Sequence, residues 1–351
     1  MTNGGLNRQN ILGIFIGKND LASSDIYADL KKHGLDISLV TVKRLLGQMA
    51  KDGVLEISGA GRSVKYNIGS RGRLFTNIDA ATYCAIDPDK RYGQKNYNFE
   101  LFAAFPAELF TNEEKNIVET ATATYHSRVS DSSATIQEKE LERFVIELSW
   151  KSSKIEGNTY TLLDTEKLIS QGIEAPGHDK REAIMILNHK NAFKFVHENS
   201  AIFKNLTRAG LEEIHKILVS GLNVNLGFRK KPVGVTGSIY RPLDNPHQIA
   251  EAVEALGHAV SRAANAYTKA FIALIGISYV QPFEDGNKRT ARLVANAILL
   301  AYGLAPLSYR SVDEKTYRET TLVFYELNSL VAFKKIFIEQ YDFAARNYAV
   351  K

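Results

Sequence analysis

Residues 281–292 are Gln-Pro-Phe-Glu-Asp-Gly-Asn-Lys-Arg-Thr-Ala-Arg, and they lie between two apolar segments with helical spacing, 271–280 and 290–302. This placement predicts a loop that enters the N-terminus of a helix, where the first N–H groups have no acceptor within the helix. Gly286 allows another group to approach the backbone closely. A helix start with free N–H groups and an open backbone favours the binding of an anion.

The charged and polar side chains of this stretch suit phosphate. Arg289 and Arg292 are three residues apart, so both project from one side of the expected helix, and each guanidinium can hold phosphate oxygens. Asp285 offers a hard oxygen for Mg²⁺ bridging a polyphosphate, and Asn287 offers an amide donor. An isolated Asp-Gly-Asn is instead typical of a helix start whose aspartate caps N–H groups. The two arginines in register favour a cradle for nucleotide phosphates.

The stretch resembles the signature loop of the Fic (filamentation induced by cAMP) family, His-x-Phe-x-Asp/Glu-Gly-Asn-Gly-Arg-x-x-Arg. The matching fixed positions are Phe283, Asp285, Gly286, Asn287, Arg289 and Arg292. The similarity extends over roughly residues 135–348. It implies a mainly α protein, a Fic-type helical bundle with a small β-hairpin flap. It also implies that the protein binds ATP and Mg²⁺ and transfers AMP to a hydroxyl of a target protein.

By position, the resemblance assigns a role to each matching residue. Asp285 would hold Mg²⁺, and Phe283 would anchor the loop in the core. The pocket for the nucleotide phosphates would be formed by Gly286, Asn287, Lys288, Arg289 and Arg292.

Gln281 stands where the family has the catalytic histidine that takes the proton from the target hydroxyl. An imidazole can accept a proton near neutral pH, whereas a carboxamide cannot. General-base help is worth about 10²- to 10⁴-fold, so we expect AMP transfer to be weak. His247 and His258 lie well upstream and could approach only through the fold. The sequence does not separate a natural pseudoenzyme from an inactivated form.

Lys288 stands where the commonest family pattern has a second glycine. Its side chain crowds the approach of phosphate to the backbone and adds a positive charge. Asn-Lys-Arg-Thr also occurs in the Doc branch of the family, which phosphorylates its target. A Doc-like transfer of phosphate to protein therefore stays open as an alternative reaction.

Residues 152–158, Ser-Ser-Lys-Ile-Glu-Gly-Asn, end a long expected helix and resemble the family's inhibitory motif, Ser/Thr-x-x-x-Glu-Gly/Asn, at Ser152, Glu156 and Gly157. In the family this glutamate pairs with the second arginine of the signature, here Arg292. A carboxylate on that guanidinium competes with the γ-phosphate of ATP for the same donors. The alternative is a helix C-terminus ended by Gly157, with a solvated glutamate.

Residues 227–240 contain glycines and alternate outside any helical period, which predicts a β-hairpin. By resemblance this is the Fic flap, and residues 232–240 would dock an extended segment of the target protein. Strand pairing of this kind needs exposed backbone rather than particular side chains, so the target is not identified. A plain connection between two helices is the alternative.

The first 70 residues resemble a winged helix-turn-helix, with three expected helices followed by two strands joined by a Gly-rich turn. In the third helix the buried stripe would be Leu39, Val42, Leu45, Leu46 and Met49. Its other face carries Thr41, Lys43, Arg44 and Gln48, and Arg62 lies near the wing tip. Residues 38–65 could therefore contact DNA. Winged helices also dock proteins, and the small excess of positive charge in this unit leaves both roles open.

The predicted domains are the winged-helix unit at 1–70, a connector at 71–133 and a Fic domain with its inhibitory helix at 134–351. The net charge of +5 excludes a protein that coats nucleic acid along its whole surface. No apolar stretch reaches the roughly 20 residues that a membrane span needs. Cys84, the single cysteine, excludes an intrachain disulfide, and the start of the sequence lacks a secretory pattern, so we expect a cytoplasmic location.

Two classes of function follow. The first is a Fic-type AMP transferase scaffold, inhibited by Glu156 and impaired at Gln281. The second is a DNA-binding regulator without catalysis, in which the Fic pocket only senses a nucleotide. The oligomeric state stays open, a homo-oligomer included.

Overall fold

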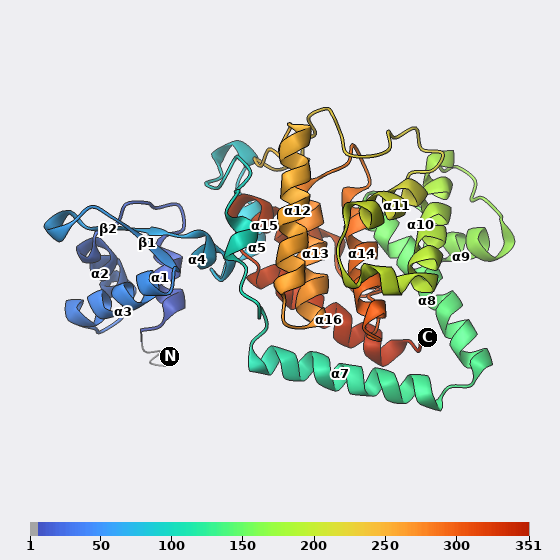
Figure 1. Cartoon of the computed structure of the whole chain (residues 1–351), viewed down its shortest axis with the longest axis horizontal. Coiled ribbons are helices and arrows are strands. Elements are labelled where there is room, and N and C mark those ends of the chain that lie inside the picture. The colour runs from blue at the N-terminus through green and yellow to red at the C-terminus, as the bar shows by residue number, and fades with distance from the viewer. Residues whose placement is uncertain (1–5, 351) are drawn as a thin grey trace.

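The computed structural model describes residues 6–350, and almost all of its regular structure is helical (Figure 1). Within that range the strands are the two of one antiparallel sheet, β1 (Leu55–Ser58) and β2 (Lys65–Ile68). Figure 1 shows a small N-terminal unit beside a larger helical body, with α4 between them. The mainly helical architecture expected from the sequence is confirmed.

The N-terminal unit consists of three helices followed by the β1–β2 hairpin. The helices are α1 (Arg8–Ile14), α2 (Ser23–Lys32) and α3 (Leu39–Lys51). An isolated antiparallel bridge between Leu21 and Tyr66 adds a third extended segment to the hairpin, which the sequence did not predict. The unit has a core of its own, formed mainly by Ile11, Leu12, Phe15, Ile26, Leu30, Val42, Leu46, Met49, Leu55 and Tyr66. The winged-helix assignment itself remains a prediction.

Helix α3 buries one face and exposes the other. Three residues of the expected stripe, Val42, Leu46 and Met49, are fully buried. Leu39 and Leu45 are only partly buried. The opposite face presents exposed polar and basic side chains to solvent, as expected: Lys43, Arg44 and Gln48.

Residues 71–133, expected to be a connector, pack into the larger body. They contain most of α4 (Ser70–Leu74) together with α5 (Ala80–Cys84), α6 (Leu101–Ala104) and α7 (Asn112–Asp131). Tyr97, Phe102, Phe110, Val118 and Tyr125 belong to the main hydrophobic core. Helix α7 lies along α16 (Figure 1). This segment is therefore part of the helical body in structure, while the proposed domain boundaries remain a prediction.

The helical body is built around the adjacent helices α13 and α14. Its helices are α8 (Ala134–Ile155), α9 (Leu162–Gln171), α10 (Lys180–Glu198), α11 (Arg208–Leu218), α12 (Pro246–Arg262), α13 (Ala266–Val280), α14 (Asn287–Ala301), α15 (Glu314–Leu327) and α16 (Val331–Asn347). Every residue of α13 from Ala270 to its end is buried, because apolar side chains cover all of its sides. Gly276 lets α12 approach, since a Cβ there would lie 2.3 Å from a methyl of Leu256.

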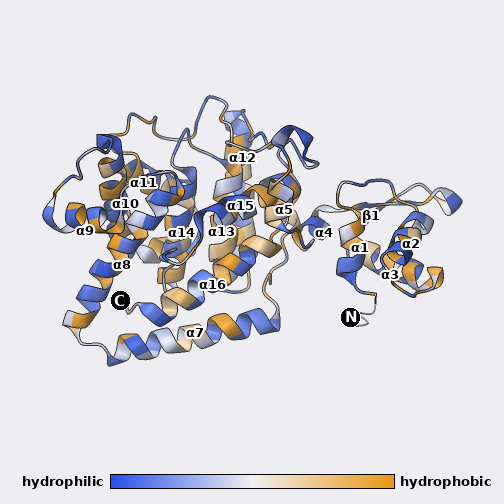
Figure 2. Ribbon diagram, turned by 180° about the vertical axis from the view of Figure 1, so that it is seen from behind, coloured by the Kyte–Doolittle hydropathy of each residue, from blue (hydrophilic) through white to orange (hydrophobic). Residues whose placement is uncertain are grey.

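The surrounding helices are amphipathic. Coloured by hydropathy (Figure 2), most of them alternate between hydrophobic and hydrophilic residues along their length, as expected for helices with one buried face. Among residues 6–350, no helix combines the length and the apolar character needed to cross a membrane.

The predicted β-hairpin flap is wrong in its secondary structure. Residues 227–241 form an irregular loop whose single ladder contact is a parallel bridge between Arg241 and Asn96. The backbone groups of this loop find partners in distant segments instead of across a hairpin. The N–H of Arg229 donates to the carbonyl of Pro282 at 2.9 Å, and the N–H of Ile239 donates to the carboxylate of Glu326 at 3.2 Å. Pro232 also has no N–H to offer to a strand ladder.

Candidate functional site

The loop between α13 and α14 is held in one shape by its own residues. Gln281 ends α13 in the left-handed region, with φ +51°, and Gly286 precedes α14 with φ +79°. The side chain of Asn287 closes the loop, because its Oδ1 accepts from the N–H of Phe283 and its Nδ2 donates to the carbonyl of Phe283, both at 2.8 Å. Asn287 therefore lines the cavity while its amide group is used to shape the loop.

Two residues from other segments support this loop, and the sequence did not point to either. His215 on α11 stacks on the buried ring of Phe283, with ring centroids 3.8 Å apart, and its Nε2 donates to the carbonyl of Asp285 at 3.0 Å. Burial lowers the pKa of His215 to about 4, so the ring is neutral at pH 7. Arg229 is also buried, and its Nε donates to the carbonyl of Gln281 at 2.7 Å.

The start of α14 is left open to solvent and ligand. No side chain caps this helix, and the N–H groups of Asn287, Lys288 and Arg289 meet no acceptor in the described part of the chain. The carboxylate of Asp285, which the capping alternative would use on these groups, pairs with Arg289 instead, Oδ2 to Nη2 at 3.0 Å. Free N–H groups at a helix start favour a bound anion.

Arg289 is almost fully buried, with an exposed fraction of 2%, although its partner Asp285 keeps a side chain that is 60% exposed. Burial lowers the pKa of Arg289. Its Nη1 is buried and has no acceptor among residues 6–350. A buried donor without a partner is costly, so this atom is available to an incoming acceptor.

Arg292 lies fully buried between α14 and the end of α8. Its Nε donates to the Oγ of Ser152 at 2.8 Å, and its Nη2 donates to the carbonyl of Ser152 at 2.9 Å and to Oε1 of Glu156 at 2.8 Å. Its Nη1 has no acceptor in the described structure. Burial lowers the pKa of Arg292, but the carboxylate of Glu156 outweighs burial and raises it overall. The solvated alternative for Glu156 is therefore not what the structure shows.

Glu156 is shared by two cations. Its second oxygen, Oε2, lies 3.6 Å from Nζ of Lys288, the residue that departs from the commonest family pattern. Burial raises the pKa of Glu156, but the charges of Arg292 and Lys288 outweigh burial and hold it below its usual value. Gly157 adopts φ +101° directly after it and ends the helical path. The carboxylate is thus fixed in its charged form.

These residues surround a cavity of about 170 Å³. The lining residues come from the end of α8, the loop 233–236 and the start of α14: Glu156, Val233, Gly234, Val235, Thr236, Gln281, Glu284, Asp285, Gly286, Asn287, Lys288 and Arg289. Pockets that bury a whole small molecule usually measure about 300–1,000 Å³. A nucleotide therefore needs more room than this arrangement gives, and Glu156 is part of the wall that limits the cavity.

The side chain of Gln281 is buried at the edge of this cavity. Its Nε2 donates to the carbonyl of Ser278 at 2.6 Å and lies 3.4 Å from the hydroxyl of Tyr325. Neither His247 nor His258 lines the cavity, and both stand on α12. Neither of these histidines therefore takes the place of the family's histidine at this position.

For Mg²⁺, the exposed carboxylate of the cavity lining is that of Asp285. The lining also contains Glu284, which accepts from Asn225, and Glu156, which pairs with Arg292 and Lys288. Among the described residues, no group of three or more histidines, cysteines or carboxylates lies close enough to hold a metal ion by itself. Mg²⁺ in nucleotide sites is usually held by one or two carboxylates, with phosphate oxygens and waters as its other ligands. One exposed carboxylate beside free N–H groups at a helix start fits that donor set.

A buried carboxylate on α15 fixes the loop that covers the cavity. Oε1 of Glu326 accepts from the hydroxyl of Ser238 at 2.7 Å, and Oε2 accepts from the hydroxyl of Tyr83 at 2.7 Å. Nη1 of Arg91 lies 3.3 Å from Oε1 and also donates to the carbonyl of Gly237 at 2.9 Å. We call these five residues the Glu326 cluster. Through this cluster the flap is tied to the segment that follows the N-terminal unit.

Comparison with known proteins accounts for this geometry. Residues 205–299, which include α11, the flap and the open start of α14, match the sequence model described as the Fic/DOC family. The chain contains a Fic domain. The loop at 281–292 is thus the Fic signature loop, and the resemblance stated from the sequence is confirmed.

Relatives with a Fic domain share part of their length with this chain. It is 29% identical over 184 residues to the protein adenylyltransferase Fic of Nematostella vectensis, covering 48% of this chain and 41% of that protein. The corresponding protein of Aedes aegypti is 28% identical over 203 residues, covering 54% of this chain and 39% of that protein. The match therefore spans about two fifths of the length of these relatives.

Solved Fic structures share the fold. A Fic-domain-containing signaling protein from Bacteroides thetaiotaomicron superposes with a TM-score of 0.56 at 16% identity, over 65% of this chain and 94% of that one. Fic-1 from C. elegans gives a TM-score of 0.58 at 19% identity, over 67% of this chain and 72% of that one. The helical body of this chain therefore has the Fic fold.

Proposed function

We propose that this chain is a Fic-type protein adenylyltransferase, which uses ATP and Mg²⁺, is held in a state of low activity by Glu156 and is slowed by Gln281. The observation that carries the proposal is the contact of Glu156 with Arg292 beside the open start of α14. The Fic domain and the names of its relatives support AMP transfer as the reaction.

The phosphates of ATP would bind where donors lack partners. These donors are the first N–H groups of α14 and the Nη1 atoms of Arg289 and Arg292. Asp285 would hold Mg²⁺, which when bound supplies positive charge to the phosphates and helps to orient them. Asp285 would then exchange its pairing with Arg289 for the metal and free that guanidinium for phosphate.

Glu156 would oppose this binding through direct competition. Its carboxylate occupies Nη2 of Arg292, a donor that a terminal phosphate oxygen of ATP would need. It also carries a full negative charge next to the place where the phosphate charge would build up. Binding of ATP in a productive position would therefore require α8 to release this carboxylate.

In the transfer itself, the hydroxyl oxygen of the target attacks the α-phosphorus of ATP. The bond from that phosphorus to the bridging oxygen breaks, pyrophosphate leaves, and the hydroxyl proton must go to an acceptor. Oε1 of Gln281 has no donor bound to it in the described structure, so it can accept a hydrogen bond from the hydroxyl and orient it. A carboxamide does not take the proton, so the step would run without general-base help.

The target would dock on the flap, residues 232–240. The N–H groups of Val233, Gly234, Val235 and Thr236 have no acceptor among residues 6–350, and these residues line the cavity. Unpaired backbone next to the site can pair with an extended peptide, a mode of recognition that does not need a regular strand in advance.

Labelling with ATP tests the reaction. The chain and its Glu156→Gly, Gln281→His and double variants are incubated with Mg²⁺ and ATP labelled at the α- or the γ-phosphate, with lysate proteins as targets. We expect α-label on protein, faint in the unchanged chain and strongest in the double variant. Transfer of γ-label without α-label would instead establish the Doc-like phosphate transfer, and no protein label in the double variant would contradict both reactions.

A second function, DNA binding without catalysis, is favoured by one observation on α3. Lys43 and Arg44 are exposed on its outer face and form no ion pair with any described residue, so both are free to contact phosphate. The regulator hypothesis predicts duplex binding that responds to ATP. Each phosphate contact contributes about 0.9 to the slope of log affinity against log salt, so Lys43→Ala with Arg44→Ala should reduce the slope by about 2. Binding with an unchanged slope would contradict contact through α3.

A further inference from the structure

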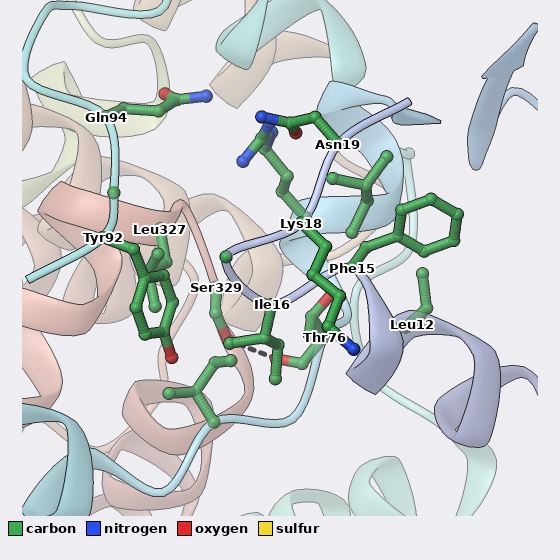
Figure 3. A pocket seen from close by; sticks show the side chains of 15 residues that line it. Leu12, Phe15, Ile16, Lys18, Asn19, Thr76, Tyr92, Gln94, Leu327 and Ser329 are labelled. Atoms are coloured by element: carbon green, nitrogen blue, oxygen red, sulfur yellow. Dashed lines mark hydrogen bonds between the residues drawn. The ribbon is translucent and has the colours of Figure 1, made fainter. Parts of the chain in front are cut away.

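A second cavity lies where the N-terminal unit meets the Fic body. It measures about 310 Å³, which is larger than the cavity at the signature loop. Its walls come from the end of α1 and the loop after it, from residues 73–78, from the segment 92–94 and from the end of α15 (Figure 3). Its volume is in the range of small-molecule pockets, which often form between domains.

The lining combines apolar walls with a larger polar surface. Leu12, Phe15, Ile16, Ile78 and Leu327 form apolar walls, and the ring of Tyr92 adds an aromatic surface. Tyr92 is fixed in place, because its other neighbours are the ring of Tyr83, at 5.3 Å between centroids, and the backbone of Gly17. None of the lining residues is an aspartate or a glutamate.

Two polar groups of this lining lack partners. Arg73 is partly buried, and its guanidinium donates no hydrogen bond to any residue in the range 6–350. Burial lowers the pKa of Arg73. The charge of the nearby Glu56 acts in the opposite direction, although Glu56 forms no ion pair with Arg73. Oε1 of Gln94 is buried and has no donor in the described structure. In Figure 3 the amide of Gln94 and the side chain of Asn19 point toward one another across the same space.

We propose that this junction cavity is a binding site for a small anionic ligand with an aromatic or apolar body. The anionic group would pair with Arg73, a donor on the ligand would satisfy Oε1 of Gln94, and the body would lie against Phe15 and Tyr92. Oε1 of Gln94, the buried atom of the two, would then be paired, which removes the cost of burying it alone, and Arg73 would gain a charged partner. Lys18, also in the lining, is already paired with Asp29 at 2.8 Å and is not needed.

A ligand bound in this cavity would affect the flap through the Glu326 cluster. The N–H of Gln94 donates to the carbonyl of Glu326 at 2.6 Å, and the carboxylate of Glu326 holds Ser238 and Ile239. A ligand that fixes Gln94 would therefore also fix the flap beside the signature loop. The binding proposal itself does not depend on the proposed reaction.

Calorimetry with phenyl phosphate and benzoate on the full chain tests the site, with phenol as the neutral probe. We expect saturable binding of at least one anionic probe, about tenfold to hundredfold weaker in Arg73→Gln, because a charged hydrogen bond is lost. Arg71→Gln is the matched control, since Arg71 is exposed on the same short helix, and it should bind like the unchanged chain. The preferred probe identifies the anionic group as phosphate or carboxylate.

Two further variants locate the binding. Gln94→Glu places a negative charge in the cavity and should abolish binding of both anions. Arg289→Gln weakens the phosphate-binding loop and should leave binding unchanged, which separates this site from the Fic site. Equal binding in Arg73→Gln and the unchanged chain, or no saturation by either anion, would overturn the proposal.

Discussion

Nζ of Lys288 lies 3.6 Å from Oε2 of Glu156, whereas Arg292 binds the other carboxylate oxygen, Oε1. Each oxygen of this carboxylate therefore faces its own cation. The lysine that departs from the commonest signature pattern is part of the same contact as Glu156, the glutamate proposed to be inhibitory. Its side chain keeps 31% of its surface exposed, whereas that of Arg292 is fully buried, so the arginine is the stronger partner.

Removing Glu156 should strengthen ATP binding. In Glu156→Gly the Nη2 of Arg292 becomes available to phosphate, and one charged hydrogen bond of about 1.5–3 kcal/mol corresponds to roughly tenfold to hundredfold tighter binding. Calorimetry with ATP and Mg²⁺ measures the change. Glu138→Gly, which removes an exposed glutamate from the same helix, is the control and should leave affinity unchanged. Equal affinity in Glu156→Gly and the unchanged chain would show that the contact does not restrain nucleotide binding.

Lys288 should act mainly through Glu156. A partly exposed ion pair at this distance is worth about 1 kcal/mol or less, so Lys288→Ala should change ATP affinity by about fivefold at most. A double-mutant cycle with Glu156→Gly measures the coupling between the two residues. If Lys288→Ala has the same effect with and without Glu156, the lysine contacts the nucleotide and not the carboxylate.

The pKa of His215 predicts a loss of stability in mild acid. It is lowered from 6.5 to about 4, so between these pH values the unfolded chain binds the proton more readily than the folded chain. The stabilisation is complete above pH 6.5 and declines as the pH falls toward 4, by at most about 3 kcal/mol. Urea unfolding of His215→Gln at several pH values should show a shallower decline than the unchanged chain. His258→Gln, at an exposed position on α12, should keep the original slope.

Glu326 should be important for stability. Its side chain is fully buried and that of Arg91 is 5% exposed, so Glu326→Ala leaves Arg91 without its ion-pair partner and the hydroxyl of Ser238 without its acceptor. Removing one partner of a buried ion pair costs about 3–5 kcal/mol, and Glu326→Gln, which keeps an acceptor, should cost less. Denaturant unfolding measures both. Glu339→Ala, from an exposed pair on α16, should change the free energy of unfolding by less than about 0.5 kcal/mol. A similar small change for Glu326→Ala would contradict the role assigned to the cluster.

The signature loop was predictable because its information is local. The spacing of Arg289 and Arg292 fixes their common direction on a helix, and the positions around Gly286 fix the turn. The helices were predictable for the same reason, since the apolar periodicity of each helix can be recognised within its own segment. The placement of Glu156 beside Arg292 followed from a motif and not from spacing, because α8 and α14 meet only in the fold.

The positions of the other residues around the site and the shape of the flap depend on contacts between segments that are distant in the sequence. His215, Arg229 and Glu326 are ordinary residues in the sequence, and only packing brings them to the signature loop and the flap. The flap was predicted as a hairpin because its residues alternate, but Pro282 and Glu326 supply the hydrogen bonds that a partner strand would have supplied. The pairing of Lys288 with Glu156 cannot be predicted from spacing, because the two residues are far apart in the sequence and meet only in the fold.

The position of the Glu326 cluster separates two ways of controlling this protein. The cluster joins Tyr83 and Arg91, which lie just after the N-terminal unit, to the flap, and no hydrogen bond or ion pair among residues 6–350 joins it to the signature loop. A turn of the N-terminal unit relative to the helical body would strain the flap before it strains the signature loop. If the proposed function holds, access of the target, rather than occupancy by the nucleotide, is the step that the N-terminal unit is placed to govern.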